Sequence, residues 1–318
     1  MTVPILKSPG GIYLQTASPA MASAVGFAAD VSQAVELNQD IRTGMEQAGI
    51  YESRASIVAR RPGIVFGTTQ LKAYLDLMDV TGSYRCINSD GSHPGLDAYQ
   101  LAHNRCSARD LTDSDRFRVS DGLIVTDSIS VTHQGRAEIA AHVEAITDGT
   151  NEPIVKAEDI TYPNDATDDQ EYSLYACDVG GVALTGLKGI TIEPGIEIIK
   201  EDADGSIWPE WVSVLSQLTR IRLSGINAGW LASGVLPIAG KAVTHANTTL
   251  RLVKMASGSS YASLGSSVHI TITVAGLACV TTAASATGRG ISNTDAMIYC
   301  LHDGTNEPLQ IDAAAALT

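Results

Sequence analysis

The sequence has few cations, few aromatic residues and no long apolar run, and each shortage excludes a class of protein. It carries 21 Lys and Arg against 35 Asp and Glu, a formal net charge of −14. Tight binding to the DNA backbone needs clustered cations, so this balance argues against it. No window approaches the roughly 18 apolar residues of a transmembrane helix, and no signal peptide follows Met1. We therefore expect a protein made in the cytosol without a membrane anchor.

The usual patterns of catalytic and metal-binding residues are also missing. The five cysteines are odd in number and include no Cys-x-x-Cys pair, which favours reduced thiols. The seven histidines show no metal-ligand spacing, and no nucleophile elbow, Walker loop or dinucleotide fingerprint occurs. Residues 202–205 (DADG) resemble the start of a calcium loop but lack a third ligand and the closing Glu. We expect no catalytic, cofactor or metal site, and an enzyme has no support from these residues.

The remaining composition is typical of a β-rich protein. Aromatic residues make up 5% of the chain, Gly reaches 29 residues and hydrophobic residues are 44%. Thr, Ser and Ala are common throughout, and this mixture suits short strands and many turns better than a helical bundle. The length allows two domains of about 150 residues each.

A six-residue sequence, DGTNEP, occurs twice, at residues 148–153 and 303–308. A Gly-Arg pair precedes each copy. Earlier in each half a Pro-Gly-Ile sequence begins an apolar run, at residues 62–66 and 194–198. Self-similarity at several places in the same order indicates an internal duplication.

The duplication predicts two homologous domains. The acidic, breaker-rich segment 163–171 is the natural linker, which gives domains at 1–162 and 172–318. The predicted fold class is therefore mainly β, with two tandem β-sandwich or barrel domains and one flanking α-helix in each.

Each predicted helix rests on the spacing i, i+3, i+4, i+7, which places apolar residues along one helical face. The first is expected after Thr68 or Thr69, either of which would be its N-cap. The second is expected after Pro209, which suits the first turn of a helix. The apolar residues at this spacing are Leu71, Tyr74, Leu75 and Met78 in the first half and Trp211, Val214, Leu215 and Leu218 in the second.

Each DGTNEP sequence is predicted to be a hairpin loop, because Asp-Gly supplies a turn signal and Pro marks the start of a return strand. Residues 137–145 look helical alone, whereas their counterpart at 296–301 looks like a strand. Homologous copies must agree, and the duplication favours a strand near 141–147. The return strands are expected from Ile154 and from Leu309. The loop residues singled out are Asp148, Gly149, Asn151, Asp303, Gly304 and Asn306.

Two segments of the first half look irregular. Residues 82–115 contain many breakers and are predicted to be a long loop that is functional or contacts a partner. Residues 1–25 are small and turn-prone, with a turn at 8–11. Within them, residues 17–24 are either an extended arm or a frayed terminus.

The layout resembles that of phage tail tube proteins, in particular the duplicated kind found in some long non-contractile tails. The features that carry the resemblance are a β-rich core, one helix after the first strands and a terminal hairpin, all present twice in an acidic chain without catalytic motifs. In that family six domains make a ring whose inner wall is a continuous β-barrel. A duplicated chain would build it from three copies with pseudo-sixfold symmetry.

The resemblance also implies partners and a location. The partners would be further copies of the chain, other tail proteins (tape measure, tail tip and terminator) and double-stranded DNA in transient, non-specific passage. The location would be the virion, after synthesis in the host cytoplasm. Family lumens are typically electronegative, and the net charge of −14 agrees with this. The residues expected to face the channel are Thr126, Ser128, Ser130, Thr271 and Thr273.

Two alternative classes stay open. One is another virion component, such as a decoration or baseplate protein, or a non-viral filament subunit. The other is a β-sandwich binding module or enzyme, which would show a pocket with convergent polar groups and a stable monomer.

Overall fold

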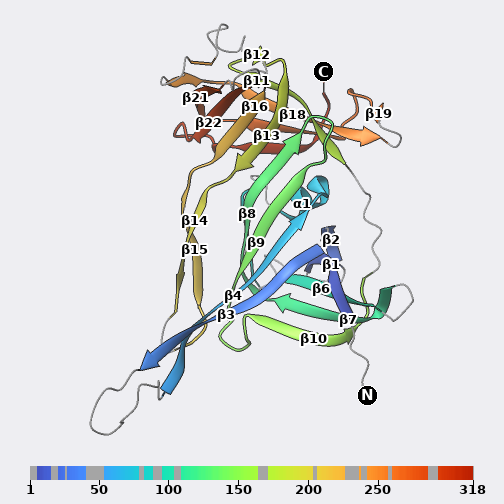
Figure 1. Cartoon of the computed structure of the whole chain (residues 1–318), viewed down its shortest axis with the longest axis vertical. Coiled ribbons are helices and arrows are strands. Elements are labelled where there is room, and N and C mark those ends of the chain that lie inside the picture. Colours follow the sequence, from blue (N-terminus) through green and yellow to red (C-terminus); the bar gives the residue numbers. More distant parts are fainter. Residues whose placement is uncertain are drawn as a thin grey trace.

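Strands make up most of the described chain, and its one helix is α1 (Leu71–Leu77) (Figure 1). The fold class is therefore mainly β, as predicted. No helix in the described part is long and apolar enough to cross a membrane. The computed structural model describes residues 6–15, 21–25, 27–40, 54–78, 82–88, 95–103, 109–163, 171–202, 206–225, 236–237, 242–256, 260–285 and 293–317.

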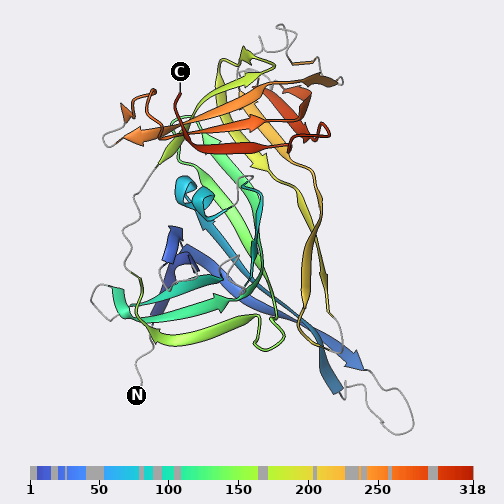
Figure 2. The ribbon, with the colours of Figure 1, turned by 180° about the vertical axis from the view of Figure 1, so that it is seen from behind.

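A five-stranded antiparallel sheet lies at one end of the molecule and is built from the first half alone (Figures 1 and 2). Its strand order is β10-β7-β6-β1-β2. The strands are β1 (Leu6–Gln15), β2 (Met21–Val25), β6 (Leu96–His103), β7 (Arg109–Val119) and β10 (Ile154–Ile160).

A six-stranded antiparallel sheet lies at the other end and is built from the second half alone. Its order is β12-β11-β18-β20-β23, with β19 beside β18. The strands are β11 (Tyr172–Val179), β12 (Val182–Ala183), β18 (Thr248–Ala256), β19 (Ser260–Tyr261), β20 (His269–Val274) and β23 (Gln310–Ala315).

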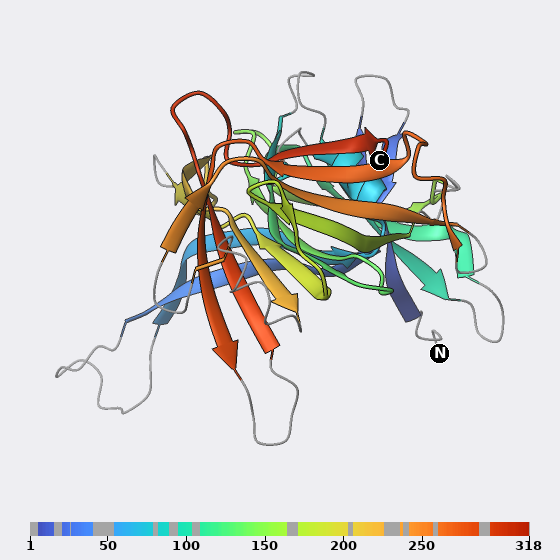
Figure 3. The same ribbon diagram turned by 90° about the horizontal axis from the view of Figure 1, so that it is seen from above.

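A ten-stranded sheet runs through both halves, in the order β17-β21-β22-β16-β13-β8-β9-β4-β3, with β5 beside β8. Seen from above, the six-stranded sheet crosses it at a steep angle (Figure 3). A separate two-stranded ribbon, β14 (Ile196–Glu201) with β15 (Trp211–Gln217), extends the β13–β16 hairpin. The ten strands are β3 (Phe27–Asp40), β4 (Arg54–Thr68), β5 (Tyr84–Ile87), β8 (Asp121–Thr132), β9 (Glu138–Ile146), β13 (Leu187–Glu193), β16 (Arg220–Gly225), β17 (Ala242–His245), β21 (Leu277–Ser285) and β22 (Asn293–Leu301).

The core lies between the ten-stranded sheet and the two smaller sheets, and its main hydrophobic cluster includes residues of both halves. A second, smaller cluster contains Tyr13 and Tyr99. Strand β9 shows why these residues form strands: Ile139, Ala141, Val143 and Ala145 are buried, while the residues between them are exposed or half-buried. Removing these alternating side chains from water stabilises the sheet by roughly 25 cal/mol per Å² of apolar surface. The strand predicted near 141–147 is thus confirmed.

Helix α1 confirms the first of the two predicted helices. Its Leu71, Tyr74, Leu75 and Leu77 are buried, and it packs near β2 and β23. The N-cap position is Gln70, not one of the predicted threonines. The backbone N–H of Gln70 donates a hydrogen bond to the Oγ1 of Thr68 at 3.1 Å.

The second predicted helix is wrong, because residues 211–217 form strand β15. Trp211 and Leu215 are 70% and 63% exposed, so their helical spacing marks no buried helix face. Val212 and Val214 alternate with exposed residues instead, and β14 supplies the hydrogen-bonding partner. An available partner strand outweighs a four-residue spacing that also fits a helix.

The long loop predicted at 82–115 is also wrong, since it contains β5, β6 and the start of β7. A charged residue of this segment is satisfied within the five-stranded sheet. Asp97 is buried and accepts two hydrogen bonds from the Arg118 guanidinium, at 2.9 and 3.0 Å. Residues 89–94 lie outside the described residues.

The N-terminal segment is more regular than predicted. Residues 8–11 lie inside β1, where a register shift between Pro9 and Ile12 replaces the expected turn. Residues 21–24 belong to β2 and pair with β1, while residues 17–20 of the predicted arm lie outside the described residues.

The two Pro-Gly-Ile sequences occupy different strands of their hairpins. Residues 62–64 lie inside β4, the returning strand, whereas Pro194 and Gly195 stand between β13 and β14, on the outgoing one. This part of the predicted alignment is therefore wrong. The linker predicted at 163–171 lies mostly outside the described residues, and the domain boundaries stay a prediction.

Candidate functional site

The most informative feature is the junction inside the ten-stranded sheet where the two halves meet. Strand β13 pairs antiparallel with the end of β8, with Ile190 opposite Val131 and Ile192 opposite Ile129. The hydroxyls of Ser130 and Thr191 lie 3.2 Å apart across it. Strand β5 occupies the other end of the same β8 edge, opposite residues 122–125.

Both outer edges of this sheet remain open in the described chain. Strand β3 is paired with β4 alone, so its second edge has no neighbour there. At the opposite end, β17 pairs with β21 from Ala278 to Thr281, and no described strand pairs with residues 282–285 on that side. Open edges present unpaired N–H and C=O groups and readily accept another strand.

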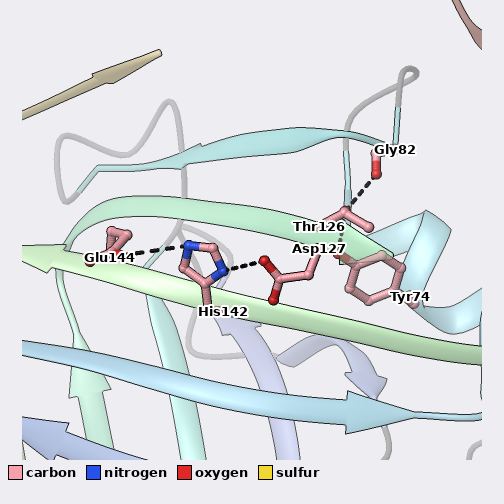
Figure 4. A network of polar contacts seen from close by, with 6 residues as sticks. All are labelled: Tyr74, Gly82, Thr126, Asp127, His142 and Glu144. Atoms are coloured by element: carbon pink, nitrogen blue, oxygen red, sulfur yellow. Dashed lines mark hydrogen bonds and ion pairs between the residues drawn. The ribbon is translucent and has the colours of Figure 1, made fainter. Parts of the chain in front are cut away.

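A β-bulge in β8 decides where the predicted channel residues lie. The register to β9 shifts between Thr126 and Ser128, so one extra residue, Asp127, stands there. Thr126 consequently faces the core: it is 1% exposed and its Oγ1 donates to the Gly82 carbonyl at 2.6 Å. Figure 4 shows it beside the Tyr74 hydroxyl, 2.5 Å away. The prediction that Thr126 faces a channel is wrong. It assumed that side chains alternate strictly between the two faces of β8, and the bulge interrupts that alternation.

The other four predicted channel residues divide between two sheets. Ser128 and Ser130 are half-buried on the outer face of the ten-stranded sheet, the face away from the core. Thr271 and Thr273 lie on β20 of the six-stranded sheet and line a shallow groove with the second DGTNEP loop. The four therefore cannot form one continuous surface.

The outer face between the junction strands is polar. It presents Asp127, Glu138 and Thr132 as exposed side chains in the first half and Asp295 in the second. Arg222 and Glu193 form an ion pair at 3.4 Å across β16 and β13. Acidic groups and small hydroxyls thus outnumber cations beside the junction.

The ribbon β14–β15, which we call the second arm, folds over the first half. The backbone N–H groups of Arg60 and Thr147 donate to the carbonyls of Ile207 and Pro209 at its tip, at 2.8 and 2.9 Å. The Arg60 guanidinium lies 4.6 Å from the centre of the Trp208 ring, a cation–π contact. The second arm is therefore fixed at its tip by backbone and side-chain contacts.

A charged network holds the middle of the second arm. His142 Nδ1 lies 2.8 Å from Asp127 Oδ1 and its Nε2 lies 3.6 Å from Glu144 Oε1 (Figure 4). Glu144 also pairs with Lys200 of β14. Burial, with the neighbouring Arg61 guanidinium, lowers the pKa of Lys200 to about 8. The network couples β8 and β9 to the arm.

The two DGTNEP loops have the same internal geometry. In each, Oδ1 of Asp148 or Asp303 accepts the backbone N–H groups two and three residues on, at 2.6–2.8 Å. The following glycines, Gly149 and Gly304, have φ of 81° and 94°, which favours Gly. The Nδ2 of Asn151 or Asn306 completes each loop by donating to the same Asp at 2.8 Å.

The hairpin interpretation of these loops is wrong, because each one connects two different sheets. The first links β9 of the ten-stranded sheet to β10 of the five-stranded sheet, and the second links β22 to β23 of the six-stranded sheet. Turn residues specify a reversal of the chain, but they do not specify that the flanking strands pair.

The described residues contain no group of three or more His, Cys, Asp or Glu side chains placed to hold a metal ion. The junction, the open edges and the second arm are therefore the features from which function is argued. The sequence matches no protein-family model, and no curated protein matches it.

Proposed function

We propose that the chain is a tandem duplication of one β-domain and acts as the tube subunit of a long, non-contractile phage tail. Strand order supports the duplication. The order β10-β7-β6-β1-β2 of the first half matches β23-β20-β18-β11-β12 of the second, position by position along the chain. In the shared sheet, β8-β9-β4-β3 matches β21-β22-β16-β13 in the same way.

Register supports the same conclusion. With the DGTNEP loops aligned, buried Thr126 matches Thr282, and both hydroxyls donate to the carbonyl of a residue that precedes the next edge strand, Gly82 or Pro237. Strands β5 and β17 then pair with β8 and β21 in the same register. The donor threonines and the edge-strand registers match, although Gly82 stands two residues before β5 and Pro237 five before β17. Matching positions in the same order are expected of repeated domains.

The pairing of β13 with β8, at the junction between the halves, is the observation that best supports assembly. Because β13 corresponds to β3 and β8 corresponds to β21, the β13–β8 pairing is a head-to-tail contact between two domains. Among the described residues, β3 is open at one end of the sheet and the end of β21 is open at the other. The same contact between copies pairs β3 of one chain with β21 of the next, and Val31 falls opposite Ala284. Repetition closes the sheet into a ring, which removes all such edges.

The resemblance to duplicated tail tube proteins gives the order of the ring, which is three chains carrying six domains. The ten-stranded sheet then forms the inner wall, and Ser128, Ser130, Glu138 and Asp127 face the channel. Hydroxyls and carboxylates there would let double-stranded DNA slide, since anionic groups repel its phosphates. The chain's net charge of −14 supports this role.

Electron microscopy of the purified protein, with its mass in solution, tests this function. We expect rings of three chains, or tubes, with a central hole wide enough for duplex DNA. Val31→Pro places a residue without a backbone N–H in the open edge strand and should leave single chains. Val31→Thr keeps the donor and the branched side chain and should still assemble. A protein that stays monomeric at every salt concentration, or a proline variant that assembles normally, would contradict the proposal.

A further inference from the structure

The second arm covers a face of the first half, and no described residues cover the matching face of the second half. In the first half, Leu123 and Val125 on the outer face of β8 are each 3% exposed, and β14 and β15 pack against that strand. The register of the loops matches these residues to Cys279 and Thr281 on β21. Both are only half-buried.

The open face of the second half also carries apolar surface that no other described part of the chain covers. Leu277 and Leu301 form a cross-strand pair on β21 and β22 and are 40% and 37% exposed. Met297 and Tyr299, which match His142 and Glu144 under the second arm, are half-buried. An exposed apolar pair at the rim of a face that is covered in the other half marks a contact site.

The first half has an arm of its own. Residues 35–40 of β3 and 54–59 of β4, which we call the first arm, continue past the sheet as a ribbon and extend away from the rest of the chain (Figures 1 and 2). Both arms carry the same irregularity: the register shifts between Glu36 and Leu37 in one, and between Glu197 and Ile198 in the other.

These shifts fix the correspondence between the arms. Gln39 matches Lys200, and Leu37 and Ile57 stand at the register positions of Ile198 and Val214. Ile198 and Val214 are half-buried in a ribbon whose alternate residues are exposed, so this side of the second arm faces the first half. The first arm thus has apolar residues at the positions that the second arm uses for docking.

We propose that the first arm docks across the outer face of β21 and β22 in a second copy of this chain, as the second arm docks on β8 and β9 within the chain. The occupant is another copy because the head-to-tail junction brings the first half of one chain beside the second half of the next. The proposal therefore rests on the ring assembly above. In the docked state Gln39 lies over Tyr299, as Lys200 lies over Glu144.

Cross-linking with a short bis-maleimide tests the contact. In a background with Cys86, Cys106 and Cys279 changed to Ser, a copy carrying Gln39→Cys is co-assembled with one carrying Tyr299→Cys. We expect a covalent dimer of two chains. The matched control combines Gln39→Cys with Glu144→Cys, the corresponding position in the first half, and should give none because the second arm covers it. Lys200→Cys with Glu144→Cys should cross-link within a single chain.

Native Cys279 gives an independent readout without substitutions. Docking covers it as Leu123 is covered, so its labelling by a thiol reagent should slow about tenfold or more on assembly. Rings or tubes that form without the Gln39–Tyr299 cross-link and with Cys279 still reactive would overturn arm docking alone. Failure to form any ring or tube would overturn the assembly and the docking together.

Discussion

The two halves of this chain differ most in what lies on the outer face of their shared sheet. In the first half an arm from the second covers β8 and β9, and Leu123 and Val125 are buried. In the second half no other described residues cover that face of β21 and β22, and Leu277 and Leu301 are exposed. One chain thus contains one docked arm with the face that it covers. It also contains a first arm, which extends away from the rest of the chain, and a face on β21 and β22 that no other described residues cover. A domain pair of this kind is expected to be completed by copies of itself.

The largest loss of stability is expected from truncating core residues that occupy matching positions in the two halves. Ile64 and Ile221 occupy the same register position next to β9 and β22, and both are 0% exposed. Replacing either by Ala should lower the free energy of unfolding by about 2–5 kcal/mol, because each leaves a cavity. Urea unfolding followed by circular dichroism measures this. A loss at one position with none at the other would argue against equivalent cores.

A smaller effect is expected from the matched buried threonines. Thr126→Val and Thr282→Val each remove the donor to a buried carbonyl, at Gly82 or Pro237. Each should cost about 1–3 kcal/mol, since the carbonyl loses its partner away from water. Thr132→Val, at an exposed position of β8, is the control and should change little. Stability of either variant equal to that of the control would show that the shared hydrogen bond does not stabilise that half.

The smallest effect is expected at the two DGTNEP loops, where the pH dependence of loop order can be compared between the halves. Hydrogen bonds from Asn151 and Asn306 lower the pKa of Asp148 and of Asp303, the latter to about 2. A carboxyl with a lowered pKa stabilises its loop fully above the unfolded value of 3.8 and loses that effect as the pH falls through the folded value. Order of the 303–308 loop should therefore survive at pH 4 and disappear towards pH 2, and order of the 148–153 loop should be lost only below pH 3.8.

Amide chemical shifts of Asn151 and Asn306, followed by NMR during acidification, measure this transition in both loops at once. Glu138→Gln, at the end of β9 opposite the first loop, is the control and should leave both curves unchanged. Midpoints near 3.8 in either loop would mean that its hydrogen bonds do not hold the carboxylate.

Internal repetition made part of this fold predictable. Residues 137–145 resemble a helix by composition, yet their counterpart at 296–301 read as a strand, and β9 is a strand. The reason is physical: β9 and β22 both bury alternate residues against the core, and that packing environment outweighs local propensity. Helix α1 was predictable because its apolar spacing meets a core on one side.

The errors came from properties that are not local. Residues 211–217 fit a helical spacing, but the partner strand β14 decides their structure. Thr126 was misplaced because one bulge residue, Asp127, exchanges the two faces of β8. The sheet to which β20 belongs depends on pairing with β18 and β23, which no spacing within β20 records. The candidate site, which consists of a junction and two open edges, therefore became visible only with strand order.

The most direct test of the central claim is a cryo-electron microscopy map of the assembled protein at a resolution that separates strands. Our account predicts a closed ring in which β3 of each chain pairs antiparallel with β21 of its neighbour, with Val31 opposite Ala284. The β13–β8 junction should repeat this contact within every chain. Assemblies in which β3 stays unpaired, or in which chains meet through other surfaces, would contradict it.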